Sequence, residues 1–492
     1  MRRYKTYING EWFEGASGIV LRSVDPSNNK ELGEIVQNSK EDVEYAIESA
    51  SRSFYKTREW RDLDVQQRSD KLLKIADMIE SEIDEIAKTE SMDNGKPLRE
   101  AQADVDDAVH CFRYYAGLIR TPSGQTYNVN SNFGNMHSYT VKEPVGVCAL
   151  ITPWNFPFLM SVWKIAPALA AGNSIIFKPS SETVLSALKL FEILDKCDLP
   201  KGTANLVIGS GSTVGNLLAE SKKVDMITFT GSTSVGQGIM RAAAGNVKKI
   251  GLELGGKSPN IVFADTDIDK TVECVMMGIF LNQGEVCCAG SRLIIEKSIK
   301  DKFLKKLVER TDKLTLGAPL DNPDMGPLIS KKHMQDVLGY IEKGKAEGAK
   351  LLCGGYKCTD DDLVNGNFIK PAIFDDCTPD MSIVREEIFG PVLTVLTFET
   401  EEEIELANDT DYGLAGAVFC NDTAKALRVI KEVRAGITWI NCYNPAFSEA
   451  PWGGYKMSGI GRELGTSGLD EYQETKQINI NISGTPLGWY NH

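Results

Sequence analysis

The chain has 492 residues, of which 42% are hydrophobic and 25% are charged. These fractions are close to globular averages and exclude a largely disordered chain, and a size of roughly 150 residues per domain predicts about three domains. The 68 Asp and Glu outnumber the 54 Lys and Arg, which leaves a net charge of −14. An acidic surface repels nucleic-acid phosphates and anionic lipids, so we expect no nucleic-acid partner and no membrane partner.

The 11 cysteines and 4 histidines show no spacing typical of a metal site. There is no Cys-x-x-Cys, and no two histidines stand two or four residues apart, so the sequence predicts no zinc site. The odd number of cysteines forms no disulfide framework, which favours a reducing compartment. No signal-peptide pattern opens the chain, and no apolar run approaches the ~20 residues of a membrane helix. We therefore expect a cytoplasmic protein.

The first part of the chain is predicted to be mainly helical after a short hairpin. Residues 7–12 contain an Asn-Gly turn between two short apolar segments, which predicts that hairpin. Ser39 and Asp42 form a capping-box pattern ahead of a helix. Apolar residues at helical spacing then predict helices over residues 67–94 and 97–118.

From residue 145 onward, short apolar runs alternate with helical patterns. Runs that are apolar throughout predict strands buried on both faces, and hence parallel sheets with helices on each side. The predicted strands of a first sheet are 145–151, 174–178, 204–208 and 226–230, and those of a second are 260–263, 292–295 and 392–396. Ligands of such sheets bind beyond the carboxyl ends of the strands. The alternating tail at 477–482 predicts an edge strand that can pair with another subunit.

Four segments carry candidate chemistry, each with a simpler alternative. Gly231 and Ser232 follow a predicted strand and open a helix, where backbone N–H groups bind phosphate, although a plain strand-to-helix turn is equally expected. Cys287 follows a glycine-rich turn and, at a helix N-terminus, would be a nucleophilic thiolate; the alternative is a buried bystander. Glu253 stands between two leucines and, if buried, would have a raised pKa and suit a general base; the alternative is a surface carboxylate or an ion pair. Asn155 lies in a loop with two prolines, where its amide could donate to an oxyanion or cap its own loop.

Seven segments, in one order, carry a resemblance to a known family. They are TPWNFP (152–157), FKPS (177–180), FTGSTSVG (229–236), LELGGKSPNI (252–261), FLNQGEVCCAGSR (280–292), EEIFGPV (386–392) and PWGGYKMSGIGRELG (451–465). Over essentially its whole length the chain resembles the NAD(P)-dependent aldehyde dehydrogenase superfamily. The resemblance implies an α/β fold with a doubly wound parallel-sheet cofactor domain (1–125 and 145–255), a second α/β catalytic domain (256–456) and a small bridging sheet for oligomerisation (126–144 and 472–487). Family members are homodimers or homotetramers.

The resemblance also implies a mechanism of covalent catalysis on a small-molecule aldehyde. By its position in the motif, Cys287 looks like the nucleophile, which attacks the aldehyde to form a thiohemiacetal. Asn155 and the Cys287 N–H would stabilise the oxyanion. After hydride transfer to the nicotinamide, Glu253 would activate the water that hydrolyses the thioester. Lys164 and Glu463 resemble the pair that helps relay the proton of that water.

The cofactor contacts follow from the same motifs. The matching residues are Trp154, Lys178, Gly231, Ser232, Glu387 and Phe389. Many members that prefer NAD have Glu three residues after the lysine, where it grips the ribose hydroxyls. Here that position is Ser181, with Glu182 displaced by one. A carboxylate there repels a 2′-phosphate and a serine does not, so we expect NAD while NADP stays open.

A second departure from the family lies beside the nucleophile. The family usually has Gln where this chain has Glu285. An ionised carboxylate close to the thiol would raise the pKa of Cys287. The alternative, which we prefer, is that the Glu285 side chain points to solvent.

Substrate choice follows from the positions that line the family's pocket. These positions match Phe156, Met160, Trp163, Glu449 and Trp452. Aromatic walls suit quaternary ammonium groups, and Glu449 would add negative charge, so we expect betaine aldehyde or another amino-aldehyde. The alternative is a broad-specificity enzyme for aliphatic or aromatic aldehydes. A catalytically silent structural relative is not favoured, because the nucleophile, base and oxyanion donor are all present.

Overall fold

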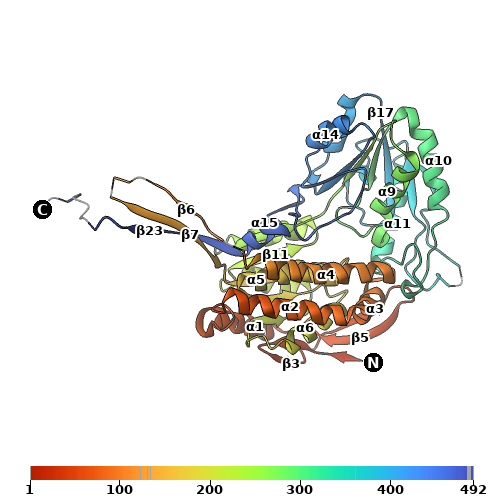
Figure 1. Ribbon diagram of the computed structural model, residues 1–492. Coiled ribbons are helices and arrows are strands. Elements are labelled where there is room, and N and C mark those ends of the chain that lie inside the picture. The colour runs from red at the N-terminus through yellow and green to blue at the C-terminus, as the bar shows by residue number, and fades with distance from the viewer. Residues whose placement is uncertain are drawn as a thin grey trace.

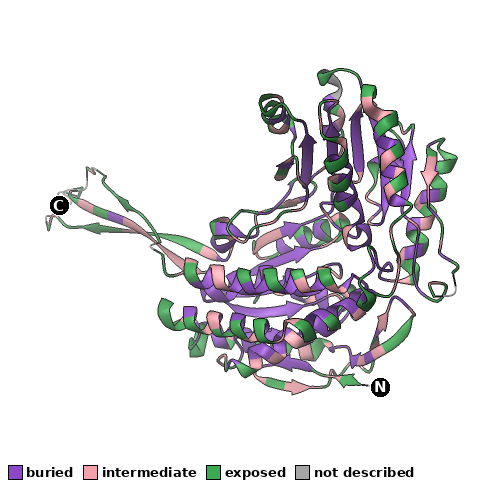
Figure 2. Ribbon diagram, turned by 45° about the vertical axis from the view of Figure 1, so that its right-hand side comes forward, coloured by how far each residue is buried: buried purple, intermediate pink, exposed green. Residues whose placement is uncertain are grey.

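The computed structural model describes residues 2–121, 123–129, 131–132, 134–360, 362–484 and 489–490. Two large, mostly parallel sheets with helices on their faces form the body (Figure 1). Figure 2 shows the strands of these sheets buried between layers of partly exposed helices. The α/β fold expected from the alternating pattern is confirmed.

The first large sheet has eight strands. In order across the sheet they are β22 (Gly459–Ile460), β12 (Lys249–Glu253), β11 (Met226–Thr230), β8 (Val147–Ile151), β9 (Ser174–Lys178), β10 (Ala204–Leu206), β2 (Thr6–Ile8) and β3 (Glu11–Phe13). The five strands from β12 to β10 run parallel. The Asn9-Gly10 turn joins β2 to β3, as expected, and both turn residues have positive φ.

Alternate residues of each central strand enter two different cores, which makes this sheet doubly wound. In β8, Cys148 and Leu150 face one core, whereas Val147, Ala149 and Ile151 face the other. The helices that cover the first face are α2 (Val65–Ser81), α3 (Ile83–Asn94), α4 (Leu98–Leu118), α5 (Pro157–Ala171) and α6 (Leu185–Lys196). Those on the second face are α1 (Lys40–Arg52), α7 (Asn216–Glu220) and α8 (Thr233–Ala243).

One predicted helix is wrong in extent. The pattern over 67–94 predicts a single helix, but the structure divides it into α2 and α3 at Glu82, whose φ of −114° and ψ of 13° leave the helical region. The break turns the chain so that α3 packs against both α4 and α6. The capping box at Ser39 and Asp42 is confirmed at the start of α1.

The second large sheet has seven strands. In order they are β15 (Lys350–Cys353), β16 (Ala372–Asp375), β17 (Val392–Phe398), β14 (Arg292–Glu296), β13 (Pro259–Val262), β19 (Ala415–Phe419) and β20 (Ile437–Ile440), with only β15 antiparallel to its neighbour among these described strands. Apolar residues of α9 (Ile268–Phe280) and α10 (Lys300–Thr311) cover one face, and those of α11 (Lys331–Ala346) and α14 (Thr423–Glu432) cover the other.

A three-stranded sheet forms an arm that projects from the body (Figure 1). It consists of β6 (Thr126–Tyr127), β7 (Met136–Pro144) and β23 (Gln473–Asn481), and α15 (Gly465–Glu471) leads into it. β23 pairs antiparallel with β7 along its whole length and forms an edge, as the alternating tail predicts. Residues 130, 133 and 485–487 of the predicted oligomerisation strands lie outside the described residues, as do residues 1, 122 and 361 of the other two predicted domains.

The remaining elements are short. β1 (Arg3–Tyr4), β5 (Lys30–Val36) and β4 (Val20–Asp25) form a small sheet, and β18 (Tyr412–Gly413) pairs with β21 (Tyr455–Lys456). Short helices α12 (Ser382–Arg385) and α13 (Glu405–Asn408) lie in loops. Within the described residues, no helix combines the length and apolar character needed to span a bilayer.

Candidate active site

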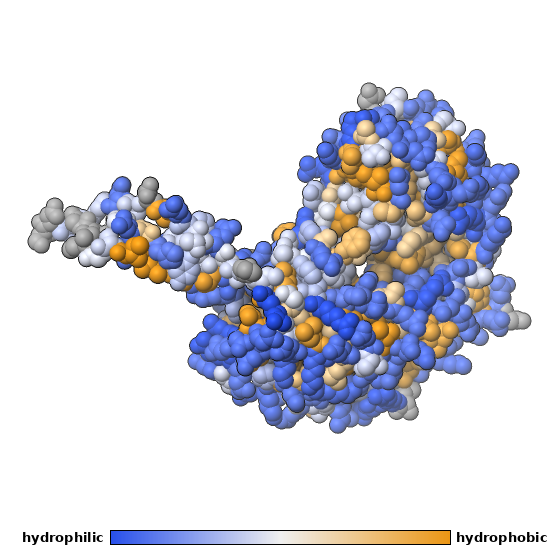
Figure 3. All heavy atoms as spheres, viewed as in Figure 1, coloured by the Kyte–Doolittle hydropathy of each residue, from blue (hydrophilic) through white to orange (hydrophobic). Residues whose placement is uncertain are grey.

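A cavity of about 1050 Å³ lies where the carboxyl edge of the eight-stranded sheet meets the loops that enter β14 and β17. Helices α4, α5 and α9 also contribute to its wall. Figure 3 shows a hollow between the two halves of the body with apolar side chains along it. The wall includes Cys287, Glu253 and Asn155, so the structure brings the three candidate catalytic residues into one site.

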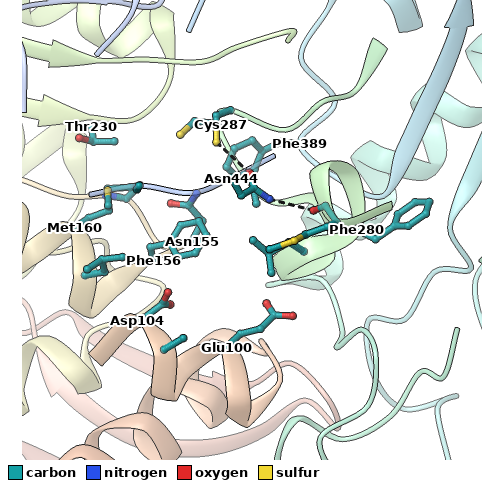
Figure 4. Close-up of a pocket in the computed structure, with 18 of the residues that line it drawn as sticks. Glu100, Asp104, Asn155, Phe156, Met160, Thr230, Phe280, Cys287, Phe389 and Asn444 are labelled. Atoms are coloured by element: carbon teal, nitrogen blue, oxygen red, sulfur yellow. Dashed lines mark hydrogen bonds between the residues drawn. The ribbon is translucent and has the colours of Figure 1, made fainter. Parts of the chain in front are cut away.

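The loop after β8 positions Asn155. β8 ends at Ile151, and Pro157 begins α5, which leaves Asn155 in the short connection between them. Its Nδ2 donates to the Glu285 carbonyl at 2.8 Å, and its own carbonyl accepts from Asn282 Nδ2 at 2.8 Å. A side-chain amide carries two N–H donors, so the second remains for a ligand in the cavity. Figure 4 shows Asn155 and Cys287 on adjacent parts of the wall.

Cys287 lies in a turn, and the predicted helix N-terminus at this residue is wrong. α9 ends at Phe280, and the next turn contains Asn282 and Gln283 at φ 45° and 57°, followed by Gly284 at 75°. The residues after Cys287 form a turn and then strand β14 from Arg292, so no helix begins at the cysteine. A hydrogen bond with Cys288 and burial raise the pKa of the Cys287 thiol well above its ordinary value. The nucleophile therefore rests as a thiol and needs a base.

Glu253 is the last residue of β12 and is nearly buried in the same wall. Burial and the neighbouring Glu463 raise the pKa of Glu253 well above its ordinary value, while Lys164 opposes the rise. Its Oε2 has no hydrogen-bond partner among the described residues. A carboxyl group with a raised pKa in the wall of a cavity is suited, once ionised, to take a proton from a thiol or from water.

Lys164 and Glu463 lie behind Glu253 and not in the cavity wall. Lys164, on α5, is fully buried, forms an ion pair with Glu463 and donates to Thr228 Oγ1 at 3.0 Å. The backbone of Glu463 pairs in both directions with that of Trp452, at 2.7 Å each way. The pair thus connects the region behind Glu253 to the wall residue Trp452.

The predicted cofactor residues lie along the carboxyl edge of the eight-stranded sheet. Trp154 follows β8, Lys178 ends β9, and Gly231 and Ser232 follow β11 at the start of α8. This is the edge at which open parallel sheets bind nucleotides.

Two further predicted cofactor residues come from the loop before β17. Glu387 accepts a hydrogen bond from the Gly256 N–H at 3.0 Å, and burial raises the pKa of Glu387 to about 7. Phe389 has a φ of 59° and contacts the Trp154 ring at 5.2 Å between centroids. Both line the cavity together with Trp154, Gly231 and Ser232.

Lys178 and Ser181 are not part of the cavity wall. Lys178 Nζ donates to the Pro179 carbonyl at 2.9 Å, and burial lowers the pKa of Lys178 to about 8. Ser181 is partly buried, and Glu182 is exposed. The predicted adenosine side of the cofactor site is thus spatially separate from the cavity that holds Cys287.

The preferred placement of Glu285 is wrong. Its side chain is fully buried instead of pointing to solvent, and it accepts a hydrogen bond from the Ile329 N–H at 2.9 Å. Burial raises the pKa of Glu285 well above its ordinary value. The groups that raise the pKa of Cys287 are Cys288 and Glu387, so the alternative effect of Glu285 on the thiol is not found either.

At the substrate end, four of the five predicted residues line the cavity. Phe156, Met160, Trp163 and Trp452 all do so, and the Trp163 and Trp452 rings lie edge to face at 5.4 Å. Glu449 is exposed and is not among the lining residues.

Sequence reasoning missed three carboxylates on α4 that line the cavity: Glu100, Asp104 and Asp107. Their spacing of four and then three residues places them on one helix face, which is the signal that could have found them. Figure 4 shows Glu100 and Asp104 at the cavity floor opposite Cys287. Burial raises the pKa of both to about 7, and Lys96 Nζ contacts Asp104 at 2.5 Å. Among the described residues, no group of His, Cys, Asp and Glu is arranged to hold a metal ion.

Comparison with known proteins places this geometry in a family. The model of the aldehyde dehydrogenase family matches residues 12–478. Betaine aldehyde dehydrogenase of Bacillus subtilis is 48% identical over 99% of both chains, and peroxisomal aminoaldehyde dehydrogenase 1 of Pisum sativum is 46% identical over 98% of this chain and 97% of its own. Human retinal dehydrogenase 2 is 44% identical over 97% of this chain and 92% of its own. The crystal structure of Staphylococcus aureus betaine aldehyde dehydrogenase in complex with NAD+ superposes with a TM-score of 0.96 at 44% identity, covering 99% of this chain and 96% of that one. The chain therefore belongs to the aldehyde dehydrogenase family.

Proposed function

We propose that the protein oxidises a cationic aldehyde, either betaine aldehyde or another amino-aldehyde, to its carboxylic acid with NAD as the oxidant. The observation that carries this proposal is the wall of the cavity around Cys287. It combines an aromatic pair, Trp163 and Trp452, with Glu100 and Asp107 of α4, whereas Asp104 is already paired with Lys96. Aromatic faces and carboxylates both favour a positive charge.

Cys287 and Asn155 perform the first step in this proposal. The Cys287 thiol gives its proton to the Glu253 carboxylate, and the sulfur electron pair bonds to the carbonyl carbon. The carbonyl electron pair moves to oxygen, where the free N–H of Asn155 Nδ2 and the Cys287 backbone N–H stabilise the charge. The product is a thiohemiacetal held at Cys287.

Glu253 acts on the thioester that remains after oxidation. It removes a proton from water, the water oxygen bonds to the carbonyl carbon, and the Cys287 sulfur leaves as a thiolate with the carboxylic acid released. The raised pKa of Glu253 suits it to this step because its basicity approaches that needed at neutral pH. Lys164 and Glu463, directly behind Glu253, would pass the proton on.

The residues present fit a nicotinamide cofactor. Gly255 lies so close to Glu387 that a Cβ on this glycine would be 2.1 Å from the Glu387 carboxylate. The absence of a side chain at Gly255 therefore makes room for the Glu387 side chain beside the cavity. Glu387, Phe389 and Trp154 would hold the nicotinamide end, Gly231 and Ser232 the pyrophosphate, and Lys178 the adenosine ribose. When bound, NAD accepts the hydride that leaves the thiohemiacetal carbon. NAD is preferred over NADP because the segment around Ser181, residues 177–196, contains no Arg to pair with a 2′-phosphate, and relatives of known structure hold NAD+.

A neutral aldehyde is the second candidate. Much of the wall is apolar, with Leu159, Met160, Met276, Phe280 and Val286 among its residues. Retinal dehydrogenases are nearly as similar to the chain as the aminoaldehyde enzyme is. The α4 carboxylates favour the cationic candidate, because an apolar substrate gains nothing from them.

We further propose the domain division given by the motifs, with the cofactor domain at 1–125 and 145–255, the catalytic domain at 256–456 and oligomerisation strands at 126–144 and 472–487. In this proposal the protein is a homodimer or homotetramer and works in the cytoplasm. The projecting arm supports an oligomer, because an isolated ribbon of three strands has little core of its own.

A panel of aldehydes tests the substrate. Purified protein is assayed by the absorbance of reduced nicotinamide with betaine aldehyde, 4-aminobutanal, propanal, hexanal and benzaldehyde, each with NAD and with NADP. We expect kcat/KM for the two cationic aldehydes to exceed that for propanal by about tenfold or more, the gain that one well-placed charge contact supplies. Equal or higher values for the neutral aldehydes would replace the cationic proposal with the second candidate. A higher kcat/KM with NADP would overturn the cofactor preference.

A further inference from the structure

Glu285 makes two contacts, one through its backbone carbonyl and one through its side chain, and neither belongs to the catalytic steps proposed above. Its backbone carbonyl accepts the hydrogen bond from Asn155 Nδ2 at 2.8 Å. Its carboxyl group, fully buried, accepts the Ile329 N–H at 2.9 Å and lies 3.5 Å from Gln283 Nε2. One residue thus holds the oxyanion donor at one end and the segment that leads into α11 at the other.

The loop around Glu285 has no regular structure to fix it. Asn282, Gln283 and Gly284 all have positive φ, and helix α9 has already ended. Backbone in this region is sparsely populated and persists only when its surroundings hold it. Contacts from outside the loop include the side-chain anchor at Ile329 and the Glu100 carboxylate, which accepts the Asn282 N–H at 2.9 Å. The Asn155 carbonyl, which accepts from Asn282 Nδ2 at 2.8 Å, is another.

Charge does not explain why this carboxyl group is buried. Lys96 is the cation that acts on Glu285, but it is already paired with Glu90 at 3.3 Å and Asp104 at 2.5 Å. His333 Nε2 lies 3.7 Å from Glu285, but it bonds the Phe389 carbonyl at 2.6 Å. The buried carboxyl group is thus held by hydrogen bonds, of which the one from the Ile329 N–H is the shorter, and this contact fixes its position.

We infer that Glu285 is a positioning residue for Asn155: its buried side chain anchors the loop at Ile329 so that its carbonyl orients the Asn155 amide toward the oxyanion. This inference rests on the role proposed above for Asn155. In this inference the Glu285 side chain affects turnover through the backbone carbonyl of the same residue, and it contacts neither substrate nor cofactor.

The geometry predicts a graded response to substitution at this position. Glu285→Gln keeps the length and an oxygen for the Ile329 N–H, so activity should stay within about threefold of the unmodified protein. Glu285→Asp keeps the carboxyl group but is one methylene too short to reach Ile329. Glu285→Ala removes the anchor. Both should lose about tenfold or more in kcat with little change in KM, because misplacing a donor by a fraction of an ångström weakens only the transition state. Glu347→Ala is the matched control: Glu347 also accepts a backbone N–H, that of Ser382 at 2.8 Å, and it lies outside the cavity wall.

A double-mutant cycle with Asn155 provides the decisive test. Asn155→Ala alone should lose about 10²–10³ in kcat, as the removal of an oxyanion donor does elsewhere. In that background Glu285→Ala should cost less than about twofold more, because the group it orients is gone. Melting temperatures measured in parallel identify any variant that fails to fold, and Glu285→Asp then replaces Glu285→Ala in the cycle.

The outcomes separate the two proposals. An Asn155→Ala protein with undiminished activity would remove Asn155 from the proposed mechanism, and the inference about Glu285 would fall with it, while the proposed oxidation itself would stand. A large loss in Asn155→Ala together with a full additional loss from Glu285→Ala would overturn the inference alone. A Glu285→Gln protein as impaired as Glu285→Ala would also overturn it, because the anchor at Ile329 would then not be the relevant contact.

Discussion

At the residue scale, the site contains two acids that interact. Cys287 and Glu253 face the same cavity, and the negative charge of Cys287 is one of the causes that raise the pKa of Glu253. Two neighbouring groups that both resist ionisation do not carry charge at the same time. An ionised Glu253 can therefore take the proton of the Cys287 thiol, which moves the single negative charge from the carboxylate to the sulfur. Glu253 can act again on water once it has passed that proton on through Lys164 and Glu463.

The shifted pKa values predict the pH dependence of turnover. A raised pKa means that the basic form of a group is populated only at higher pH, and both the thiolate of Cys287 and the carboxylate of Glu253 are the active forms. We therefore expect kcat/KM to rise as pH increases from about pH 6 to about pH 9, with no maximum below neutrality. The measurement is steady-state kinetics across this range, with melting temperature recorded at each pH to detect unfolding. A rate that falls with rising pH while the fold is intact would contradict this sign.

Replacement of Glu253 separates the two chemical steps. Glu253→Gln keeps the size of the side chain but cannot accept a proton from water. Hydrolysis of the thioester should slow by about 10²-fold or more, whereas oxidation slows less. Stopped-flow absorbance should then record a burst of about one reduced nicotinamide per site, followed by a slow steady rate. An unchanged steady rate would remove Glu253 from hydrolysis.

At the scale of elements, the turn between α9 and β14 decides where the nucleophile stands. Gly284 has a φ of 75°, and a Cβ there would lie 2.4 Å from the Gly390 carbonyl carbon. The turn therefore packs directly on the loop that carries Glu387 and Phe389. This close approach couples the nucleophile segment to the residues proposed to hold the nicotinamide.

Gly284→Ala should accordingly destabilise the protein and impair the site. Backbone strain of this kind costs about 1–3 kcal/mol, and the clash with Gly390 adds to it. We expect a lower free energy of unfolding in urea and a loss of more than about tenfold in kcat/KM. Gly339→Ala is the matched control: Gly339 lies within α11 with open space around it, so that variant should gain about 0.5–1 kcal/mol. If Gly284→Ala were as stable and active as the unmodified protein, this prediction would be wrong, because the turn could then accommodate a Cβ by shifting its backbone.

At the scale of the whole molecule, the three-stranded arm projects away from the two large sheets, and the helices of the body do not cover it (Figure 1). β23 alternates isoleucine with polar residues, and Ile480 is 42% exposed on it. The strand forms an open edge of the arm sheet (Figure 1). An exposed edge strand with apolar residues on one face is an aggregation hazard unless another chain covers it.

A charge on this strand should therefore disrupt assembly. We expect Ile480→Glu to shift the mass measured by light scattering toward a smaller species at low micromolar concentration, because burying an unpaired carboxylate in an interface is costly. Thr475→Glu adds the same charge on the opposite face of β23 and serves as the control. Identical masses for Ile480→Glu and the unmodified protein would show that this face of the arm does not carry the contact.

Much of the secondary structure could be predicted because its cause is local. β9 and β11 occupy the bounds expected from their apolar runs, 174–178 and 226–230, since a strand buried on both faces needs apolar residues at every position. The motifs likewise identified Cys287, Glu253 and Asn155, which line one cavity. The break at Glu82 could not be predicted, because the apolar pattern continues through it and no Gly or Pro marks the position.

By itself, the sequence determined the α/β class, the membership of the aldehyde dehydrogenase family and three residues of the site. Periodicity and motifs depend only on residues that are close together along the chain. The tertiary structure alone decided the environment of single side chains. The Glu285 carboxyl group is buried because Ile329, 44 residues further along the chain, offers it an N–H. The α4 carboxylates line the cavity that holds Cys287, and Glu449 does not. This difference depends on how the two large sheets and their helices pack together. Burial and direction depend on which distant segments pack together, and no local pattern records that.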